Sequence, residues 1–166
     1  MNVVLCGMMG SGKTTVGKEL AKALACPCVD TDECIVNRYG DISEIFQSKG
    51  EGYFRVLERE LVGELAQQDN LVISTGGGLV VNKANVTLLK EKGMLVYLRA
   101  KKQTLLSRLQ DGEGRPLLEG KGLEEKLTKL LNERESVYED AADEVVDVDG
   151  KTPEEIATEI LGRIKK

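Results

Sequence analysis

The amino-acid sequence predicts an α/β protein built around a parallel sheet, and two observations carry this prediction. Short apolar runs alternate with stretches of helical periodicity along the 166 residues. The runs are apolar throughout rather than at every second residue, which is typical of strands covered by helices on both faces. A chain of this length can bury one complete core, so we expect a single domain over residues 1–166.

Five apolar runs are the expected strands: NVVLC, CPCV, NLVIS, GMLVYL and EVVDV, at residues 2–6, 26–29, 70–74, 93–98 and 144–148. Helical stretches separate them, as connections between parallel strands require. Two of the expected helices carry start signals. Asp41 or Ser43 can cap the helix around Ile45. Residues 152–155 read Thr-Pro-Glu-Glu, a capping box with proline at the first helical position.

The charge balance disfavours two kinds of partner. Asp and Glu number 28 and Lys and Arg number 23, which gives a net charge of −5. This charge repels phosphate backbones, so we expect no nucleic-acid partner and a locally formed site for any anionic ligand. No apolar run approaches the roughly 20 residues of a membrane span, so we expect no membrane partner. We expect a monomer.

The four cysteines favour a cytoplasmic protein with reduced thiols, because the first residue leads directly into an apolar run without a signal-peptide pattern. Cys26, Cys28 and Cys34 could be ligands of a metal cluster. Their spacing lacks a second pair, however, and the sequence has no histidine to complete a zinc site. Together with Cys6, they are better interpreted as buried thiols.

The segment QDGEGRPLLEGKG, at residues 110–122, separates two helical stretches and contains four glycines. It is either an idle surface loop or a lid that closes over a ligand, and loop composition alone leaves both open. Arg115 at its centre favours a lid once the next motif is considered.

The sequence GMMGSGKT at residues 7–14 fits the P-loop pattern at every fixed position, between an expected strand and an expected helix. Its glycines let N–H groups turn toward phosphates, and the start of the helix adds its dipole. Lys13 can reach the β- and γ-phosphates, and the Thr14 hydroxyl can bind Mg²⁺. A glycine-rich turn with a solvated lysine is the alternative. The predicted nucleotide-binding residues here are Gly10, Ser11, Gly12, Lys13, Thr14 and Thr15.

A P-loop indicates a nucleotide but no particular reaction. A GTP-binding switch would carry an N-K-x-D motif late in the fold. Residues 82–85 read Asn-Lys-Ala-Asn, lack the Asp and precede the fourth expected strand, so guanine is poorly supported. A kinase of a small molecule needs instead an acceptor pocket, arginines that stabilise charge, and a lid.

Asp30 and Asp32 follow the second apolar run, which places two carboxylates at the carboxyl end of a strand. Open α/β sheets bind ligands at that edge. Because the two residues are two positions apart, we expect them to share a side of the strand end, one facing Mg²⁺ and the other an acceptor hydroxyl. Helix capping by either residue is the simpler alternative and is compatible with function.

Three consecutive glycines, Gly76, Gly77 and Gly78, interrupt the apolar stretch at residues 71–81. Each glycine costs the folded chain roughly 0.5–1 kcal/mol relative to alanine. A flexible strand exit would explain one glycine better than three. We therefore expect a ligand to approach this backbone too closely for a Cβ atom.

In combination, these motifs resemble the shikimate kinase family from end to end. The resemblance rests on GMMGSGKT, DTD, FRVLE, STGGG, RPLL, and Arg134 followed by Tyr138. It implies a three-layer α/β/α fold of the P-loop kinase type with a five-stranded parallel sheet. It also implies transfer of the γ-phosphoryl group of ATP to the 3-hydroxyl of shikimate, with Mg²⁺ as cofactor.

For the substrate, the resemblance implies that Arg55 and Arg134 bind the shikimate carboxylate, with Gly77 adding a backbone contact. Asp32 would hold the ring hydroxyls and orient or deprotonate the 3-hydroxyl. From spacing alone, Arg55 is better explained as a surface ion pair with Glu51 or Glu58. Only the joint match of the motifs favours the binding role.

For the nucleotide, the resemblance implies that Arg115 closes over the phosphates and acts with Lys13 on the transferred group. Asp30 would hold Mg²⁺ through water. Arg108 resembles the arginine near the adenine, although an exposed helix residue is the simpler reading. Residues 149–153 occupy the place of the adenine loop, and there Lys151 stands where some members have arginine.

Two other functions remain open on the sequence. A kinase of another small polyol such as gluconate would use the P-loop but would need Arg55 and Arg134 less as a carboxylate-binding pair. A non-catalytic ATP-binding homologue would be expected to lack Lys13, Asp32 or a pocket arginine, and this sequence retains all of them.

Overall fold

The computed structural model describes residues 1–110 and 122–164. Its five strands are β1 (Asn2–Cys6), β2 (Cys28–Asp30), β3 (Val72–Ser74), β4 (Gly93–Arg99) and β5 (Glu144–Asp147). They form one sheet in the order β2-β3-β1-β4-β5, and every neighbouring pair is parallel. Each of the five predicted runs overlaps one of these strands to within one residue at its carboxyl end, which confirms the predicted parallel sheet.

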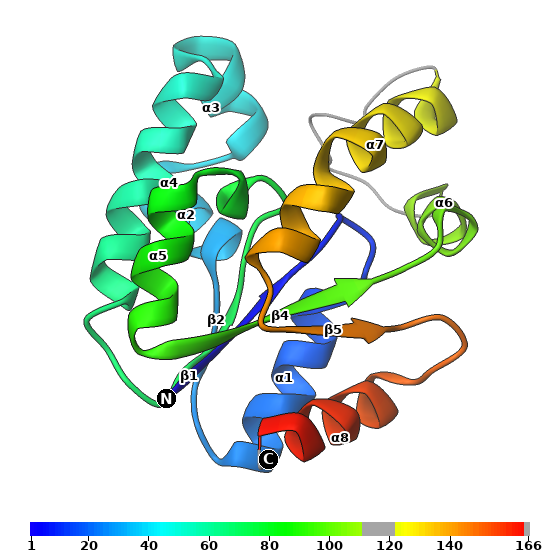
Figure 1. Ribbon diagram of the computed structural model, residues 1–166. Helices are drawn as coiled ribbons and strands as arrows, with labels where there is room; N and C mark the ends of the chain where they lie inside the picture. The colour runs from blue at the N-terminus through cyan, green and yellow to red at the C-terminus, as the bar shows by residue number, and fades with distance from the viewer. Residues whose placement is uncertain (111–121, 165–166) are drawn as a thin grey trace.

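Helices cover both faces of the sheet and confirm the three-layer architecture. Helices α1 and α8 lie on one side of the sheet, and α4, α5 and α7 lie on the other (Figure 1). Their bounds are α1 (Lys13–Leu24), α2 (Thr31–Tyr39), α3 (Ile42–Lys49), α4 (Glu51–Leu65), α5 (Lys83–Glu91), α6 (Lys102–Gln110), α7 (Leu123–Ala141) and α8 (Pro153–Ile164), with a 3₁₀ helix, η1 (Leu79–Val81), after β3. No helix in the described ranges is long and apolar enough to cross a membrane.

The core explains why the strands are apolar throughout. Strands β1, β3 and β4 lie in the middle of the sheet, and residues such as Val4, Ile73 and Leu95 are fully buried between the two helical layers. An alternating strand would place polar side chains against one of these layers.

The predicted helix starts are present, and the structure decides between the two capping residues of α3. The Asp41 carboxylate accepts a hydrogen bond from the Ser43 N–H over 2.7 Å, so Asp41 is the cap. Thr152 and Glu155 form the reciprocal bonds of a capping box at the start of α8, over 3.1 and 3.2 Å. The capping interactions therefore followed from local sequence.

The carboxyl ends of β1, β2 and β3 meet at one edge of the sheet and lead into the phosphate loop, α2 and the glycine turn at residues 76–78. Thr75, just before that turn, is bound to the strand that carries the phosphate loop. Both its N–H, over 3.1 Å, and its hydroxyl, over 2.8 Å, donate to the carbonyl of Leu5. The turn and the loop therefore share one rigid support.

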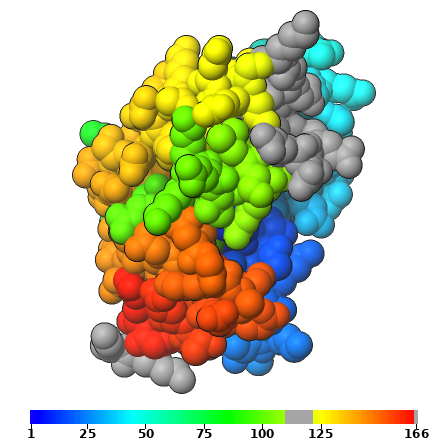
Figure 2. All heavy atoms as spheres, turned by 90° about the vertical axis from the view of Figure 1, so that its right-hand side faces the viewer, coloured from blue at the N-terminus to red at the C-terminus, as the bar shows by residue number. Residues whose placement is uncertain are grey.

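Helix α6 is bound to the loop between β5 and α8. Figure 2 shows this flank, where the green α6 lies between the yellow start of α7 and the orange β5–α8 region. Asp149 Oδ1 accepts hydrogen bonds from the Lys101 N–H over 3.0 Å and from the Thr104 hydroxyl over 2.7 Å. The loop that was predicted to face adenine therefore holds the start of the helix that carries Arg108.

Candidate active site

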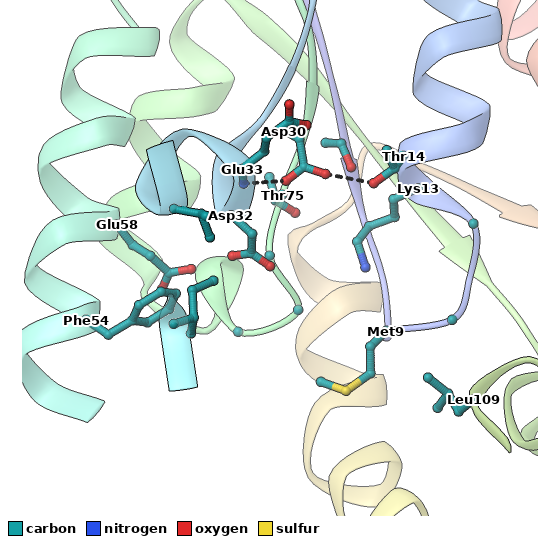
Figure 3. A pocket seen from close by; sticks show the side chains of 18 of the residues that line it. Met9, Lys13, Thr14, Asp30, Asp32, Glu33, Phe54, Glu58, Thr75 and Leu109 are labelled. Carbon is teal, nitrogen blue, oxygen red and sulfur yellow. Dashed lines mark hydrogen bonds between the residues drawn. The ribbon is translucent and has the colours of Figure 1, made fainter. Parts of the chain in front are cut away.

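One cavity of about 540 Å³ lies at the carboxyl edge of the sheet (Figure 3). Most of the predicted site residues line it, although they come from the phosphate loop, α2, α4, the glycine turn, α6 and α7. The predicted residues along its wall are Gly10, Gly12, Lys13, Thr14, Thr15, Asp30, Asp32, Arg55, Gly76, Gly77, Gly78, Arg108 and Arg134. Arg115 and most of the predicted lid, 110–122, lie outside the described residues.

The phosphate loop has a backbone that favours glycine. Gly7, Gly10 and Gly12 have φ angles of 146°, 87° and 91°, in the region that side chains rarely adopt. The Lys13 ammonium bends over the loop and donates to the carbonyl oxygens of Gly7 and Met8, over 2.7 and 3.0 Å. The Ser11 hydroxyl is buried and makes no hydrogen bond within the described residues. This concave surface of donors suits phosphate oxygens.

Thr14 and Asp30 lie side by side at the base of the cavity. The Thr14 hydroxyl donates to Asp30 Oδ2 over 2.7 Å, and the Glu33 N–H donates to Asp30 Oδ1 over 3.1 Å (Figure 3). Asp30 therefore caps α2 and faces Thr14 at the same time. A hydroxyl beside a carboxylate fits Mg²⁺, which prefers oxygen ligands and binds one or two protein groups together with substrate phosphates. The described residues contain no cluster of three or more His, Cys, Asp or Glu side chains that could hold a metal ion.

Asp32 occupies a different part of the cavity from Asp30. We expected the two carboxylates to share a side of the strand end, and this was wrong, because α2 begins at Thr31 and places Asp32 in its first turn. In Figure 3 the Asp30 side chain is directed toward Thr14, whereas Asp32 lies nearer Glu58. The helical turn thus separates the two carboxylates.

The glycine turn leaves space for charged side chains of the protein itself. A Cβ atom at Gly76 would lie 2.6 Å from Asp32 Oδ1, closer than real Cβ contacts allow, and one at Gly77 would lie 3.3 Å from Arg134 Nη1. None of residues 76–78 has a left-handed φ angle. Close packing against side chains is therefore one requirement for glycine in this turn, and the expected close approach of a ligand stays a prediction.

Arg55 both packs on this turn and forms the ion pairs that its spacing predicts. A Cβ atom at Gly78 would lie 2.6 Å from Arg55 Nη2. Arg55 Nη1 donates to Glu58 Oε1 over 2.6 Å, and Nη2 donates to Glu51 Oε2 over 3.2 Å. The two sequence-based interpretations are compatible, since the same acidic partners hold the guanidinium against the cavity wall.

Glu58 is the site residue that sequence reasoning missed. Its side chain is only 1% exposed, and its Oε2 atom has no hydrogen-bond partner within the described residues. Burial raises its pKa to about 7, although Arg55 favours the charged form, and Asp32 adds to the increase. The available signal was its helical spacing, because position 58 follows Phe54 by four residues and therefore lies on the buried face of α4.

Helix α6 touches the phosphate loop directly. Arg108 Nη1 donates to the carbonyl of Gly10 over 3.0 Å. Leu109 packs against the same glycine, and a Cβ atom at Gly10 would lie only 3.1 Å from Leu109 Cγ. Lys151 is placed differently from the other predicted nucleotide contacts. It is not among the described residues that line the cavity, and its ammonium donates to Glu159 Oε1 over 2.8 Å.

The cysteines take no part in this cavity as far as the described lining shows. All four are free thiols. Burial raises the pKa of the Cys6 thiol to about 12, and burial likewise raises the pKa values of Cys26, Cys28 and Cys34. The predicted burial is confirmed for Cys6, whereas Cys26, Cys28 and Cys34 are only partly buried.

Residues 9–165 match the family model for shikimate kinase. The chain belongs to the shikimate kinase family. A shikimate kinase from Sulfurihydrogenibium sp. (strain YO3AOP1) is 45% identical over 166 residues, covering 99% of this chain and 98% of the relative.

Solved structures of shikimate kinases have the same fold. The enzyme from Acinetobacter baumannii, solved in complex with shikimate, superposes with a TM-score of 0.95 at 36% identity, covering 99% of this chain and 92% of the other. The enzyme from Aquifex aeolicus superposes with a TM-score of 0.86 at 40% identity, covering 99% and 96%. Membership of the shikimate kinase family confirms the P-loop kinase fold and makes the protein an ATP-dependent kinase. The non-catalytic and gluconate kinase alternatives are accordingly disfavoured.

Proposed function

We propose that the protein transfers the γ-phosphoryl group of ATP to the 3-hydroxyl of shikimate, giving shikimate 3-phosphate and ADP. The observation that carries this proposal is the composition of the cavity of about 540 Å³ described above. Its one end is the phosphate loop, and its other end presents two arginines beside carboxylates. This combination suits an acidic polyol as acceptor, and the shikimate complex of the similar Acinetobacter enzyme supports the choice.

At the nucleotide end, the phosphate loop binds the triphosphate through the N–H groups and side chains of residues 10–15. Lys13 leaves the loop carbonyls and neutralises charge on the β- and γ-phosphates. Thr14 would hold Mg²⁺ directly and Asp30 through water, since their oxygens already lie 2.7 Å apart. When bound, Mg²⁺ supplies positive charge to the phosphate oxygens. Arg108 lies against the loop at Gly10, where it can contact the base.

At the acceptor end, Arg55 and Arg134 bind the shikimate carboxylate. The Arg134 side chain is 8% exposed, and its buried Nη1 atom makes no hydrogen bond within the described residues, so it has a donor available. Glu58 holds Arg55 in place through the 2.6 Å contact. Planar guanidinium groups suit a carboxylate because they can donate two parallel hydrogen bonds. The backbone of residues 76–78 completes this end of the cavity.

Asp32 orients the 3-hydroxyl and accepts its proton late in the transfer. Phosphoryl transfer proceeds through a loose transition state, so early removal of the proton contributes little to the rate. The position of Asp32, apart from Asp30 and beside the glycine turn, supports a role toward the acceptor rather than toward Mg²⁺.

The proposal has four further parts, which rest mainly on the sequence. Residues 110–122 form a lid, and Arg115 within it stabilises charge on the transferred group. The whole chain, 1–166, works as one domain. The protein is a monomer. It acts in the cytoplasm, which its four free thiols favour.

The decisive experiment measures ADP release when shikimate, gluconate and nucleoside monophosphates are offered separately with Mg²⁺ and ATP. We expect turnover with shikimate alone. Turnover with gluconate or a monophosphate but not with shikimate would overturn the acceptor, and silence with every acceptor would favour a non-catalytic protein. Omitting Mg²⁺ tests the metal requirement in the same assay.

A further inference from the structure

Tyr138 is a motif residue of the family resemblance to which no role has yet been given. Its side chain, on α7, is fully buried, and its hydroxyl donates a hydrogen bond to the carbonyl of Gly77. The same hydroxyl lies 3.8 Å from the sulfur of Met8 in the phosphate loop. Three separate parts of the site therefore meet at one oxygen atom.

This hydroxyl also lies beside the predicted carboxylate-binding group. Tyr138 follows Arg134 by four residues, so both side chains project from one face of α7. A Cβ atom at Gly77 would lie 3.3 Å from Arg134 Nη1 and 3.8 Å from the Tyr138 hydroxyl. Burial raises the pKa of Tyr138 to about 12, so the hydroxyl stays protonated and remains a donor at neutral pH.

The hydrogen bond fixes more than the carbonyl that accepts it. In a planar trans peptide the C=O of one residue and the N–H of the next point in opposite directions. Holding the Gly77 carbonyl therefore also sets the direction of the Gly78 N–H, on the opposite side of the peptide plane. Because glycine has no side chain to restrict it, this turn needs an external constraint of this kind.

We propose that Tyr138 is a positioning residue for recognition of the substrate's acid group, acting through the Gly77–Gly78 peptide and the neighbouring Arg134 guanidinium. This inference rests on the proposed function, because it assumes that a carboxylate binds between Arg55, Arg134 and the glycine turn. Tyr138 itself does not line the cavity in the described structure, so it acts through the groups that do.

The test compares Tyr138→Phe with Tyr97→Phe. Tyr97 is a matched control, because it is 1% exposed, its ring centroid lies 5.1 Å from that of Tyr138, and it does not line the cavity in the described structure. We expect Tyr138→Phe to raise the KM and Kd for shikimate about three- to tenfold, the effect of one lost hydrogen bond. The kcat and the KM for ATP should stay within about twofold, and Tyr97→Phe should change none of these quantities.

A second readout separates positioning from general loosening. The carboxamide of shikimate has the same ring but no charge, so its inhibition constant should change less in Tyr138→Phe than the Kd of shikimate does. An equal loss for both ligands, an equal loss in Tyr97→Phe, or an unchanged shikimate Kd would each overturn the proposal. If the unsubstituted enzyme does not bind shikimate at all, the proposed function itself is wrong.

A measurement on the unsubstituted protein covers the case in which Tyr138→Phe does not fold. With the Gly77 carbonyl carbon labelled, shikimate should shift its NMR signal and slow the exchange of the Tyr138 hydroxyl proton. A Gly77 signal that is insensitive to shikimate would overturn the proposal.

Discussion

The Arg55 guanidinium occupies the space that a side chain at Gly78 would need, with Nη2 2.6 Å and Nη1 2.7 Å from the position of a Cβ atom. The same guanidinium forms ion pairs with Glu51 and Glu58. A methyl group at position 78 and Arg55 in its present place are therefore incompatible. The absence of a side chain at Gly78 is therefore what allows the Arg55 guanidinium to lie against the glycine turn.

The first prediction is that Gly78→Ala raises the KM for shikimate by about tenfold or more, since it displaces a charged hydrogen-bond donor. The KM for ATP and the unfolding temperature should remain close to those of the parent enzyme. Gly77→Ala is the matched comparison, because its nearest contact would be 3.3 Å, and it should be milder. Steady-state kinetics and thermal unfolding check both variants. A lower unfolding temperature of Gly78→Ala, together with an unchanged affinity for shikimate, would contradict this prediction.

The second prediction separates the two aspartates. Asp30→Asn keeps the cap of α2 nearly isosteric but removes charge beside Thr14, so turnover should fall about 10- to 100-fold and recover in part at high Mg²⁺. Asp32→Asn should lose turnover without metal rescue, and its loss should be shared between shikimate binding and the transfer step. Single-turnover rates and shikimate affinities across a Mg²⁺ series measure this. Rescue of Asp32→Asn alone would reverse the assignment.

The third prediction concerns pH and Glu58. The folded protein keeps the Glu58 proton up to a pKa of about 7, whereas the unfolded chain releases it near the ordinary value of 4.5. The unfolded state therefore binds fewer protons between these values, and the free energy of unfolding should decrease as pH rises from 4.5 to 7, by as much as about 3 kcal/mol. Urea titrations at several pH values should show this slope in the parent protein but not in Glu58→Gln.

The control for that experiment is Glu60→Gln, an exposed glutamate on the same helix. It should retain the parental pH dependence of the free energy of unfolding. An identical slope in Glu58→Gln and in the parent protein would show that Glu58 titrates normally and that the burial argument is wrong.

The fourth prediction distinguishes the two basic residues assigned to the nucleotide. Arg108 lies on the phosphate loop, so Arg108→Ala should raise the KM for ATP about three- to tenfold. Lys151 is paired with Glu159, so Lys151→Ala should leave the KM for ATP within about twofold and reduce stability by less than about 1 kcal/mol. Kinetics with varied ATP decide between them. A large ATP effect in Lys151→Ala would restore its predicted role in nucleotide binding.

Local rules explain why much of the fold was predictable. Strand runs, helix caps and the phosphate loop are encoded within a few neighbouring residues, and the capping box at Thr152 and the P-loop glycines illustrate this. The direction of the Asp32 side chain relative to that of Asp30 was not predictable from the alternation of side chains along a strand. Helix α2 begins at Thr31, so side chains there repeat their direction every 3.6 residues instead of every two.

Glu58 shows a second limit of the sequence. Its spacing placed it near Arg55, but whether that pair lies in water or beneath other elements depends on how α4 packs against the glycine turn. Burial of this kind depends on tertiary contacts between segments far apart in the chain. The same applies to Tyr138, whose partners Gly77 and Met8 lie 61 and 130 residues away.

Because Thr75 is bonded to Leu5, the parts of the site that face the phosphoryl donor and the phosphoryl acceptor are supported by the same two strands. The turn that faces the acceptor and the loop that faces the phosphates are attached to adjacent strands, whose separation is fixed near 4.8 Å by the peptide ladder. Thermal motion of these paired strands displaces both reactants together. The distance between phosphorus and the attacking oxygen therefore changes little when the strands move.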